Sequence, residues 1–294
     1  MRILLIRHGE SVDNVAGLYA GSRDSPLTNH GVLQIKRLGA RLAKCCETTA
    51  PIKYIFTSNL RRAYETAGAI SKAIADARDP LNGNASDTCA PLEVTQLSEL
   101  REKDYGSSEG KKYRSLNSLI QADSETPESM RIRIDRFLDS HLTPIVDTHV
   151  SDKITVAIVA HGIILNVLLN GLLKRFPNPD DSATRNGNRD SRSESAAWSN
   201  TGVLQARLEM ANIVSNPDCP NDAVSSVSSV APADDSNLYG RTIRLTVEFI
   251  NNVDHLEGLK KTRGGIGSTR FDSRQRTMDS FFGPASKKRK LGDS

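Results

Sequence analysis

The sequence predicts an α/β fold: a three-layer α/β/α sandwich in which helices cover both faces of a mostly parallel central sheet. Three short apolar runs, together rich in Ile and Val, occur at residues 3–6, 53–56 and 154–159 and are typical of buried strands. Segments with helical periodicity separate these runs, and strands that alternate with helices form parallel βαβ units. The length of 294 residues and the 37% hydrophobic content are enough for one sizeable core.

The first helix is predicted from apolar residues that recur at helical spacing after the first strand. Val32, Ile35, Leu38 and Leu42 share one helical face. Thr28 precedes them, where its hydroxyl can accept a hydrogen bond from the unpaired amides of the first turn. We therefore expect a helix that begins directly after Thr28.

The remaining elements are predicted in the same way. Further helices are expected at residues 60–77, 130–142 and 163–173. The second of these carries an apolar stripe that is expected to face the core, formed by Met130, Ile134, Phe137 and Leu138. Residues 203–208 and 242–249 alternate apolar and polar side chains and are expected to complete the sheet as a hairpin.

Composition divides the chain into one domain, residues 1–263, and a C-terminal tail, residues 264–294. Two polar segments interrupt the domain at 176–200 and 212–237. Neither contains enough large apolar residues to offset the entropy lost on ordering, so we expect both to be mobile loops. The tail is rich in Gly, Ser and charged residues, and the same argument predicts that it is disordered.

The net charge of +4 is distributed unevenly. Residues 255–294 carry ten Lys and Arg against four Asp and Glu, a net charge of +6, so residues 1–254 carry −2. Direct nucleic-acid binding by the body is not expected, because contacts to a phosphate backbone require a basic surface. No apolar run reaches the roughly 18 residues of a membrane-spanning helix, so no membrane association is expected. The four cysteines lack metal-ligand spacing, and we expect reduced thiols in an intracellular protein.

Two histidine–glycine pairs stand at the ends of predicted strands, where open α/β sheets place their ligand sites. The first is His8-Gly9, directly after Arg7, and the second is His161-Gly162. One such histidine is more often a hydrogen-bonded structural residue, but two at equivalent strand ends beside an arginine favour catalysis. The combination suits phosphoryl transfer, because an imidazole nitrogen can attack phosphorus while a guanidinium holds the other oxygens.

The residues around these pairs resemble the motifs of the histidine phosphatase superfamily, which includes cofactor-dependent phosphoglycerate mutases. The signature-like segment is Leu5-Ile6-Arg7-His8-Gly9-Glu10-Ser11, followed by Asn14. Further similar segments follow in the family's order: Gly21 with Asp24 and Pro26-Leu27-Thr28, Ser58-Asn59-Leu60-Arg61-Arg62-Ala63 with Thr66, Leu100-Arg101-Glu102-Lys103-Asp104-Tyr105-Gly106 with Glu109-Gly110, and His161-Gly162. The resemblance spans residues 1–174 and implies a phosphoglycerate mutase-like fold.

Within the superfamily the chain is most similar to the TIGAR-type fructose-2,6-bisphosphatase group. Asn200-Thr201-Gly202 before a predicted strand and Asp254-His255-Leu256 near the end of the domain carry this finer resemblance. The chain departs from that group in its shorter 111–153 segment, its added loop near 212–237 and its tail. The resemblance implies a small phosphorylated substrate such as fructose-2,6-bisphosphate or a bisphosphoglycerate.

The resemblance also implies a role for each site residue and requires no metal or other cofactor. His8 is implied to be the nucleophile that forms a phosphohistidine, with His161 beside it. Arg7, Asn14, Arg62 and the backbone of Gly21 are implied to bind the phosphate. Glu102 is implied to protonate the leaving oxygen and then to activate the attacking water.

Several of these assignments have competitors. Arg61 is adjacent to Arg62 and could bind phosphate instead, although the spacing to Ala63 and Thr66 favours Arg62. Glu99 and Glu109 compete with Glu102 for the acid role, and the register against Tyr105-Gly106 favours Glu102. Glu10 is expected to support the nucleophile loop rather than to donate protons.

The tail contains a segment that resembles the motif by which replication and repair proteins bind the sliding clamp PCNA. The segment is Gln275-Arg276-Thr277-Met278-Asp279-Ser280-Phe281-Phe282. One 3₁₀-like turn would bring Met278, Phe281 and Phe282 together as an apolar plug, with Gln275 free to hydrogen-bond the rim of a pocket. The alternative is a loose hydrophobic tail, but two adjacent phenylalanines would then be exposed without a function.

A basic cluster follows this motif, formed by Lys287, Lys288, Arg289 and Lys290. Such a cluster is a candidate nuclear-localisation signal or a solvated charge run, and its place beside a clamp motif favours nuclear import. The sequence therefore predicts a metal-independent phosphomonoesterase, nuclear or cytoplasmic or both, that can be recruited to the clamp. A phosphoglycerate mutase-type transferase and a non-catalytic clamp-binding adaptor are the alternatives.

Overall fold

The fold is described from a computed structural model of the chain, which describes residues 1–48, 50–78, 91–113, 123–178, 196–211, 242–262 and 265–272. These residues form a six-stranded mixed sheet in the order β3-β2-β4-β1-β5-β6. The strands are β1 (Arg2–Arg7), β2 (Ile52–Ser58), β3 (Val94–Leu97), β4 (Thr155–Ala160), β5 (Val203–Ala211) and β6 (Thr242–Asn252). The first four are parallel to one another, whereas β5 runs antiparallel to β1 and β6 antiparallel to β5.

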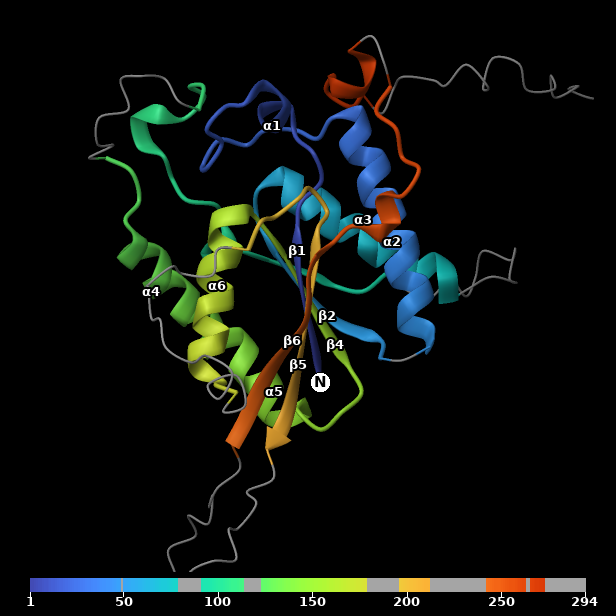
Figure 1. The fold of residues 1–294 in the computed structure, drawn as a ribbon, viewed down its shortest axis with the longest axis vertical. Coiled ribbons are helices and arrows are strands. Elements are labelled where there is room, and N and C mark those ends of the chain that lie inside the picture. Colours follow the sequence, from blue (N-terminus) through green and yellow to red (C-terminus); the bar gives the residue numbers. More distant parts are fainter. Residues whose placement is uncertain are drawn as a thin grey trace, which may run out of the picture.

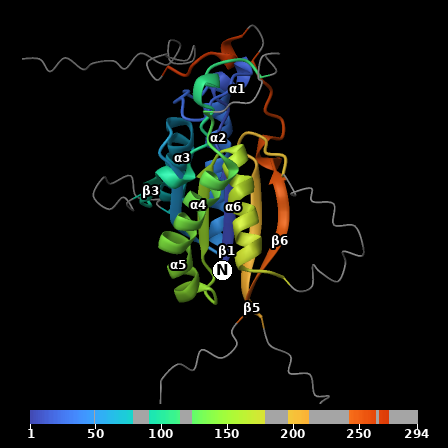
Figure 2. The ribbon, with the colours of Figure 1, turned by 90° about the vertical axis from the view of Figure 1, so that its left-hand side faces the viewer.

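Helices cover both faces of the sheet, which confirms the predicted three-layer α/β/α fold. The helices are α1 (Val12–Ala16), α2 (Asn29–Thr48), α3 (Arg61–Arg78), α4 (Pro127–Phe137), α5 (Thr143–His149) and α6 (Gly162–Arg175). In Figure 1 the sheet is seen nearly edge-on, with α4, α5 and α6 on its left and α2 and α3 on its right. Figure 2 shows α4, α5 and α6 from the front, lying over the sheet.

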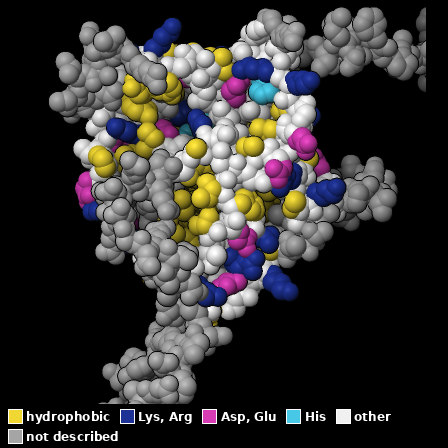
Figure 3. Space-filling view, in the orientation of Figure 1, with side chains coloured by type: hydrophobic (Ala, Val, Ile, Leu, Met, Phe, Trp, Pro, Cys, Tyr) yellow, Lys and Arg dark blue, Asp and Glu magenta, His cyan; other side chains and the backbone are white. Residues whose placement is uncertain are grey.

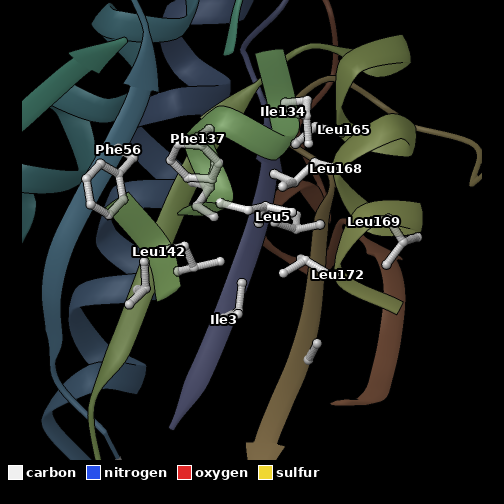
Figure 4. Close-up of a cluster of buried hydrophobic side chains, with 14 of the residues drawn as sticks. Ile3, Leu5, Phe56, Ile134, Phe137, Leu142, Leu165, Leu168, Leu169 and Leu172 are labelled. Atoms are coloured by element: carbon white, nitrogen blue, oxygen red, sulfur yellow. The ribbon is translucent and has the colours of Figure 1, made fainter. Parts of the chain in front are cut away.

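Strand β1 shows why both layers are needed. Ile3 and Leu5 belong to the apolar cluster under α4–α6, whereas Leu4 and Ile6 belong to the cluster under α2 and α3. All four side chains are almost completely buried. Figure 4 shows Ile3 and Leu5 packed beneath Phe137 and the leucines of α6. A continuous apolar run thus forms a strand with side chains buried alternately on both faces.

The local predictions for the first helix and the hairpin are confirmed. Thr28 caps α2, with its Oγ1 accepting from the Gly31 N–H at 2.9 Å. The hairpin strands β5 and β6 complete the sheet. The predicted core stripe of Met130, Ile134, Phe137 and Leu138 is also buried.

The single helix predicted over 130–142 is wrong in its second half. Helix α4 ends at Phe137, Leu138–Leu142 form a π-helical turn, and α5 begins at Thr143. Pro144 gives the reason, because proline has no amide hydrogen and its ring crowds the carbonyl of the residue four positions earlier. A wider turn relieves that crowding and leaves the chain helical on both sides.

The predicted start of the flexible tail at residue 264 is also wrong for its first residues. Residues 265–272 are described, and they pair with the segment that leads into α2. The Asn29 N–H donates to the Thr269 carbonyl at 3.0 Å, and the Phe271 N–H donates to the Leu27 carbonyl at 3.0 Å. Backbone pairing of this kind depends on position rather than on side-chain type, so composition does not reveal it. The clamp-like motif at 275–282 and the basic cluster at 287–290 lie outside the described residues.

Surface charge on the face shown in Figure 3 is mixed. Lys and Arg side chains are interspersed there with Asp and Glu, and the described residues form no continuous basic patch on this face. Within the described ranges, no helix is long and apolar enough to cross a membrane.

Candidate active site

The two histidines meet because β1 and β4 are neighbours in parallel register. Arg7 pairs with Ala160 at the carboxyl ends of these strands, and His8 and His161 follow directly. Their ring centroids lie 5.0 Å apart, and the residues are 2% and 0% exposed, respectively. The sheet therefore brings together at one edge the two histidines that the sequence places about 150 residues apart.

His8 is held as a neutral imidazole with one nitrogen free. Its Nδ1 lies 2.7 Å from the Gly9 carbonyl oxygen, which can only accept, so Nδ1 carries the proton and Nε2 keeps its lone pair. Burial lowers the pKa of His8 well below its ordinary value, and the positive charges of Arg62 and Arg7 lower it further. A neutral imidazole with an unprotonated Nε2 has the form required of a nucleophile.

His161 lies beside His8 with its ring unpaired. Neither of its nitrogens has a hydrogen-bond partner within the described part of the chain, although the side chain is fully buried. Burial lowers the pKa of His161 well below its usual range, and the charge of Arg62 adds to the effect. Buried polar groups are almost always paired, so these two nitrogens leave capacity for a ligand in the pocket.

Two guanidinium groups flank the histidines, one buried (Arg62) and one partly buried (Arg7). Arg62, 1% exposed and in the first turn of α3, donates to the carbonyls of Ala20 and Arg23 at 2.8 Å and of Gly21 at 3.2 Å. Arg7 donates to the Trp198 carbonyl at 2.5 Å, and its Nε has no partner among the described residues. Within the same residues, neither guanidinium lies within 4 Å of a carboxylate oxygen.

These arginines give the pocket a strong positive charge. Burial lowers the pKa of both Arg7 and Arg62, but an arginine remains protonated at neutral pH. The negative charge of Glu102 acts on both arginines but does not contact them directly, and an anionic ligand that enters the pocket can pair with them. The site is therefore suited to a phosphate group.

The structure separates Arg62 from its competitor Arg61. Arg61 lies at the surface, where its Nε makes an ion pair with Glu65 at 2.6 Å. Of the two, Arg62 is the one that is buried, and its phosphate-binding role stays a prediction.

Among the candidate acids, the structure places Glu102 beside the histidines. Its carboxylate accepts from the N–H groups of Ile163 and Ile164, in the first turn of α6 directly after His161, at 3.1 and 3.2 Å. A third bond comes from the Lys103 N–H at 2.9 Å. The N-terminus of a helix is a favourable place for a carboxylate, and here it fixes Glu102 next to the pocket.

The competing carboxylates have other partners. Glu109 accepts from the backbone N–H groups of Gly21, Ser22, Arg23 and Tyr105 at 3.0–3.3 Å. Glu99 accepts from the Ser98 hydroxyl at 3.1 Å. Glu10 accepts from the Thr28 hydroxyl at 2.8 Å and pairs with Lys261 at 2.9 Å, which supports the loop that carries His8.

The backbone of Gly21, predicted to bind the phosphate, is already hydrogen-bonded to Glu109 and Arg62 in this structure. The Gly21 N–H already donates to Glu109, and its carbonyl accepts from Arg62. A side chain at this position would clash, because a Cβ atom would lie 1.8 Å from the Lys103 carbonyl oxygen. In this structure Gly21 therefore serves the pocket through close backbone packing and through Arg62.

Asn14 is connected to the backbone of His8 through Asn200, a residue for which the sequence predicts no role in the site. Asn14 completes the cap of α1, and its Oδ1 also accepts from the Asn200 Nδ2 at 3.0 Å. Asn200 donates in addition to the His8 carbonyl at 3.2 Å. The next residue, Thr201, donates its N–H to the carbonyls of Arg7 and His8 and reaches His255 through its hydroxyl at 2.9 Å.

Trp198 is the site residue that sequence reasoning missed most completely. It is 8% exposed, and its carbonyl is the acceptor for Arg7. Its indole N–H donates to Asn166 of α6 at 2.9 Å, which fixes the segment. The predicted mobile loop 176–200 is therefore ordered at its C-terminal end, and the sole tryptophan of the chain within a polar segment was the available signal.

Comparison with known proteins agrees with this geometry. The family model of the histidine phosphatase superfamily (branch 1) matches residues 3–186, more than half of the chain. The chain belongs to the histidine phosphatase superfamily. It is a phosphatase of this superfamily, acting on phosphorylated substrates.

Individual relatives extend the match. A probable phosphatase of Schizosaccharomyces pombe is 26% identical over 286 residues, covering 95% of this chain and 78% of the relative. An adenosylcobalamin/alpha-ribazole phosphatase of Salmonella typhimurium is 30% identical over 188 residues, which cover 59% of this chain and 80% of the relative. A mycobacterial glucosyl-3-phosphoglycerate phosphatase shares the fold with a TM-score of 0.55 at 18% identity, over 85% of this chain and 98% of that one.

Proposed function

We propose that this chain hydrolyses a small phosphorylated metabolite through a phosphohistidine at His8. The observation that carries the proposal is the buried, neutral His8 with a free Nε2, set between Arg7, Arg62 and the unpaired ring of His161. These groups supply a nucleophile, two positive charges and further hydrogen-bond capacity within one pocket. Transfer of a phosphoryl group to a histidine nitrogen uses the nucleophile, the positive charges and the hydrogen-bond capacity together.

In the first step, Nε2 of His8 attacks phosphorus and the P–O bond to the alcohol breaks. Arg7, Arg62 and His161 hold the equatorial oxygens, whose charge grows in the transition state. The Glu102 carboxyl gives its proton to the leaving oxygen, and the Gly9 carbonyl holds the Nδ1 proton while His8 carries the phosphoryl group. In the second step, water attacks phosphorus, Glu102 takes a proton from it, and the N–P bond breaks.

The proposal includes independence from metal ions. Divalent metals in phosphoryl transfer neutralise charge on the phosphate oxygens, and here Arg7 and Arg62 provide two positive charges for that purpose. Within the described residues, no group of three or more His, Cys, Asp or Glu side chains is placed to hold a metal ion.

Hydrolysis of a panel of phosphomonoesters in the presence of a chelator tests this function. We expect turnover of the wild type to survive chelation and to vanish in His8→Asn, which keeps a polar side chain but has no nucleophilic ring. Turnover that requires added metal would contradict the mechanism. Transfer of the phosphoryl group to a second alcohol in place of water would favour the mutase-type alternative.

For the substrate, we propose a sugar phosphate or phosphorylated acid of the fructose-2,6-bisphosphate or bisphosphoglycerate kind. The resemblance of residues 200–202 and 254–256 to the TIGAR-type group supports it. His255 and Thr201 from these two segments are hydrogen-bonded to each other behind the His8 loop. A phosphatase of alpha-ribazole among the relatives also has a phosphorylated small molecule as its named substrate. The same ester panel ranks these candidates by kcat/KM.

For the tail, we propose recruitment to the sliding clamp in the nucleus. The support is the sequence itself: Gln275, Met278, Phe281 and Phe282 at motif spacing, followed by the basic cluster 287–290. A truncation after Asp272 preserves the residues that pair with α2, so it isolates the tail. We expect it to lose clamp binding and nuclear accumulation, and we expect the double variant Phe281→Ala/Phe282→Ala to lose clamp binding alone. Unchanged binding in both variants would leave the tail without this function.

A further inference from the structure

Three tyrosines that the proposed chemistry does not use form a cluster beside the catalytic pocket. The ring of Tyr19 lies 4.6 Å from that of Tyr105 and 4.8 Å from that of Tyr113, measured between centroids. The second contact is edge-to-face, at 84°, and the first is tilted at 44°. These distances and angles are those of stabilising aromatic pairs.

The cluster is built by pairing between two segments that are distant in sequence. The residues after α1 run antiparallel to the residues after Glu109. The Tyr19 N–H donates to the Lys111 carbonyl at 2.9 Å, and the Tyr113 N–H donates to the Gly17 carbonyl at 2.9 Å. Both segments lie at the upper edge of the sheet in Figure 1, the edge at which β1 and β4 end.

The backbone of the cluster is connected directly to the catalytic groups. Tyr19 precedes Ala20, whose carbonyl accepts from Arg62 at 2.8 Å. Tyr105 follows Glu102 by three residues, and its N–H donates to Glu109, the carboxylate that also binds the Gly21 amide. The cluster therefore lies on the side of the pocket where Glu102 would meet the leaving oxygen.

Charge agrees with this placement. Burial raises the pKa of Tyr105 and Tyr113, and the negative charge of Glu102 adds to both shifts. The positive charge of Arg7 opposes the shift at Tyr113. The phenol groups are thus within electrostatic range of the proposed acid and of a phosphate-binding arginine.

One ring of the cluster is open to a ligand. Tyr113 is 47% exposed, whereas the Tyr105 ring lies against Tyr19 and has the Lys103 Nζ 5.5 Å from its centroid. An exposed aromatic ring gains stabilising contacts when a flat apolar face covers it.

We propose that Tyr19, Tyr105 and Tyr113 form a leaving-group subsite that binds an alcohol carrying a ring, with Tyr113 as the stacking surface. The inference rests on the proposed function and narrows it. An acyclic phosphoglycerate presents no ring to this surface, whereas a sugar ring or an aromatic ring stacks on it. The favoured substrate is therefore the ester of a ring-bearing alcohol.

Two esters with equal numbers of carbon atoms test the subsite: benzyl phosphate and n-heptyl phosphate. We expect the wild type to prefer the benzyl ester by about 10-fold in kcat/KM, the upper end of the contribution of one aromatic pair. Tyr113→Ala is expected to reduce the preference to near unity, and Tyr113→Phe is expected to retain it. Tyr64→Ala is the matched control, since Tyr64 is 44% exposed on α3 and outside the cluster.

The outcomes separate the subsite from the proposed function. An unchanged benzyl preference in Tyr113→Ala, or an equal loss in Tyr64→Ala, overturns the subsite and leaves the phosphatase mechanism intact. Hydrolysis of p-nitrophenyl phosphate alone, with neither of the two esters accepted, overturns the subsite as well. Failure of the wild type to hydrolyse any of the three overturns the proposed function.

Discussion

Arg62 is buried and Arg7 partly buried, and neither guanidinium lies within 4 Å of a carboxylate oxygen among the described residues. Their hydrogen bonds go to backbone carbonyls, at Trp198 for Arg7 and at Ala20 and Arg23 for Arg62. Carbonyl acceptors orient a guanidinium but leave its net charge in place. The charge therefore remains available for a phosphate. Burial lowers the pKa of His8, and the arginine charges lower it further.

The adjacent arginines provide a matched test of this arrangement. Arg62→Gln is expected to lower kcat/KM by about 100- to 1,000-fold, the usual cost of one preorganised donor to a developing charge. Arg61→Gln removes only a surface ion pair with Glu65 and is expected to leave kcat/KM within about 2-fold. Steady-state kinetics on one ester measures both variants, and comparable losses would place the phosphate elsewhere.

His255 predicts how stability depends on pH. Burial lowers the pKa of His255 to about 4, below the 6.5 of an ordinary histidine. As the pH falls below 6.5, His255 becomes protonated in the unfolded chain but stays neutral in the folded chain. The free energy of unfolding therefore decreases until about pH 4, where His255 is protonated in both states. The full effect is on the order of 3–4 kcal/mol, at about 1.4 kcal/mol for each pKa unit.

Urea unfolding at pH 7.5 and pH 5 measures this contribution. His255→Asn is expected to be less stable than the wild type at pH 7.5, because the bond to Thr201 weakens, but to lose less stability on acidification. Equal losses in both proteins would show that His255 is not the titrating group. His8 and His161 shift in the same direction, so some acid sensitivity is expected to remain in the variant.

Among single residues, those that serve the site through the chemistry of their side chains can be predicted from the sequence. Arg7, His8 and His161 stand at strand ends in recognisable motifs. Trp198 could not be identified in this way, because it serves the site through its backbone carbonyl, which every residue type possesses. Gly21 was identified, but its amide contact with Glu109 depends on how two loops meet, and no local pattern encodes that.

Helix α4 positions the proposed acid through Arg133. Arg133 on α4 donates to the carbonyls of Glu99 and Arg101 at 2.5 and 2.7 Å, and more weakly to the Glu102 carbonyl at 3.4 Å. Its other face pairs with Glu125 at 2.7 Å, and both side chains are at most 15% exposed. One guanidinium thus holds the turn that carries Glu102 against the helix.

Arg133→Lys is expected to lower kcat/KM by about 10- to 100-fold for an alkyl phosphate. A lysine lacks the planar fork that reaches the three carbonyls and Glu125 at once, and a small displacement of the acid is costly. The loss with p-nitrophenyl phosphate is expected to be much smaller, since that leaving group needs little protonation. Arg131→Lys, on an exposed turn of the same helix, is the control. Equal losses with both esters would mean a general structural defect and would contradict the positioning role.

Element prediction succeeded where the hydrophobic pattern is continuous and failed where it is not. Strands β1, β2 and β4 are buried apolar runs at the centre of the sheet. Strand β3 (Val94–Leu97) was missed because it is a four-residue edge strand in which no residue is fully buried. The π-helical turn after α4 was missed because its apolar residues keep a helical spacing through Pro144.

In the whole molecule, the C-terminal part of the described chain is attached to the catalytic loops. Lys261 pairs with Glu10, His255 bonds to Thr201, and Thr269 bonds to Asn29. Figure 1 shows this segment, in red, lying at the same end of the sheet as α1 and the start of α2. Composition placed the whole of 264–294 in a flexible tail, since it contains few large apolar residues, but backbone pairing orders its first part.

Two truncations test this boundary. A chain that ends at residue 262 loses the hydrogen bonds between residues 265–272 and 27–29 and is expected to be less stable by about 1–3 kcal/mol. A chain that ends at residue 272 keeps them and is expected to match the full-length protein in stability and in kcat/KM. Chemical denaturation measures both, and equal stability of the two truncations would show that the pairing contributes nothing.

The central claim is that the phosphoryl group passes through His8, and trapping the intermediate tests it most directly. The wild type is mixed with excess substrate, quenched in alkali within one turnover, and analysed by mass spectrometry of its peptides. We expect an acid-labile, alkali-stable phosphoryl group on His8 that is absent from His8→Asn. With p-nitrophenyl phosphate, whose leaving group needs little protonation, we expect more of this phosphoryl group in Glu102→Gln, because that variant activates water poorly. Full turnover with no phosphorylated His8, or the same phosphoryl group in His8→Asn, would contradict it.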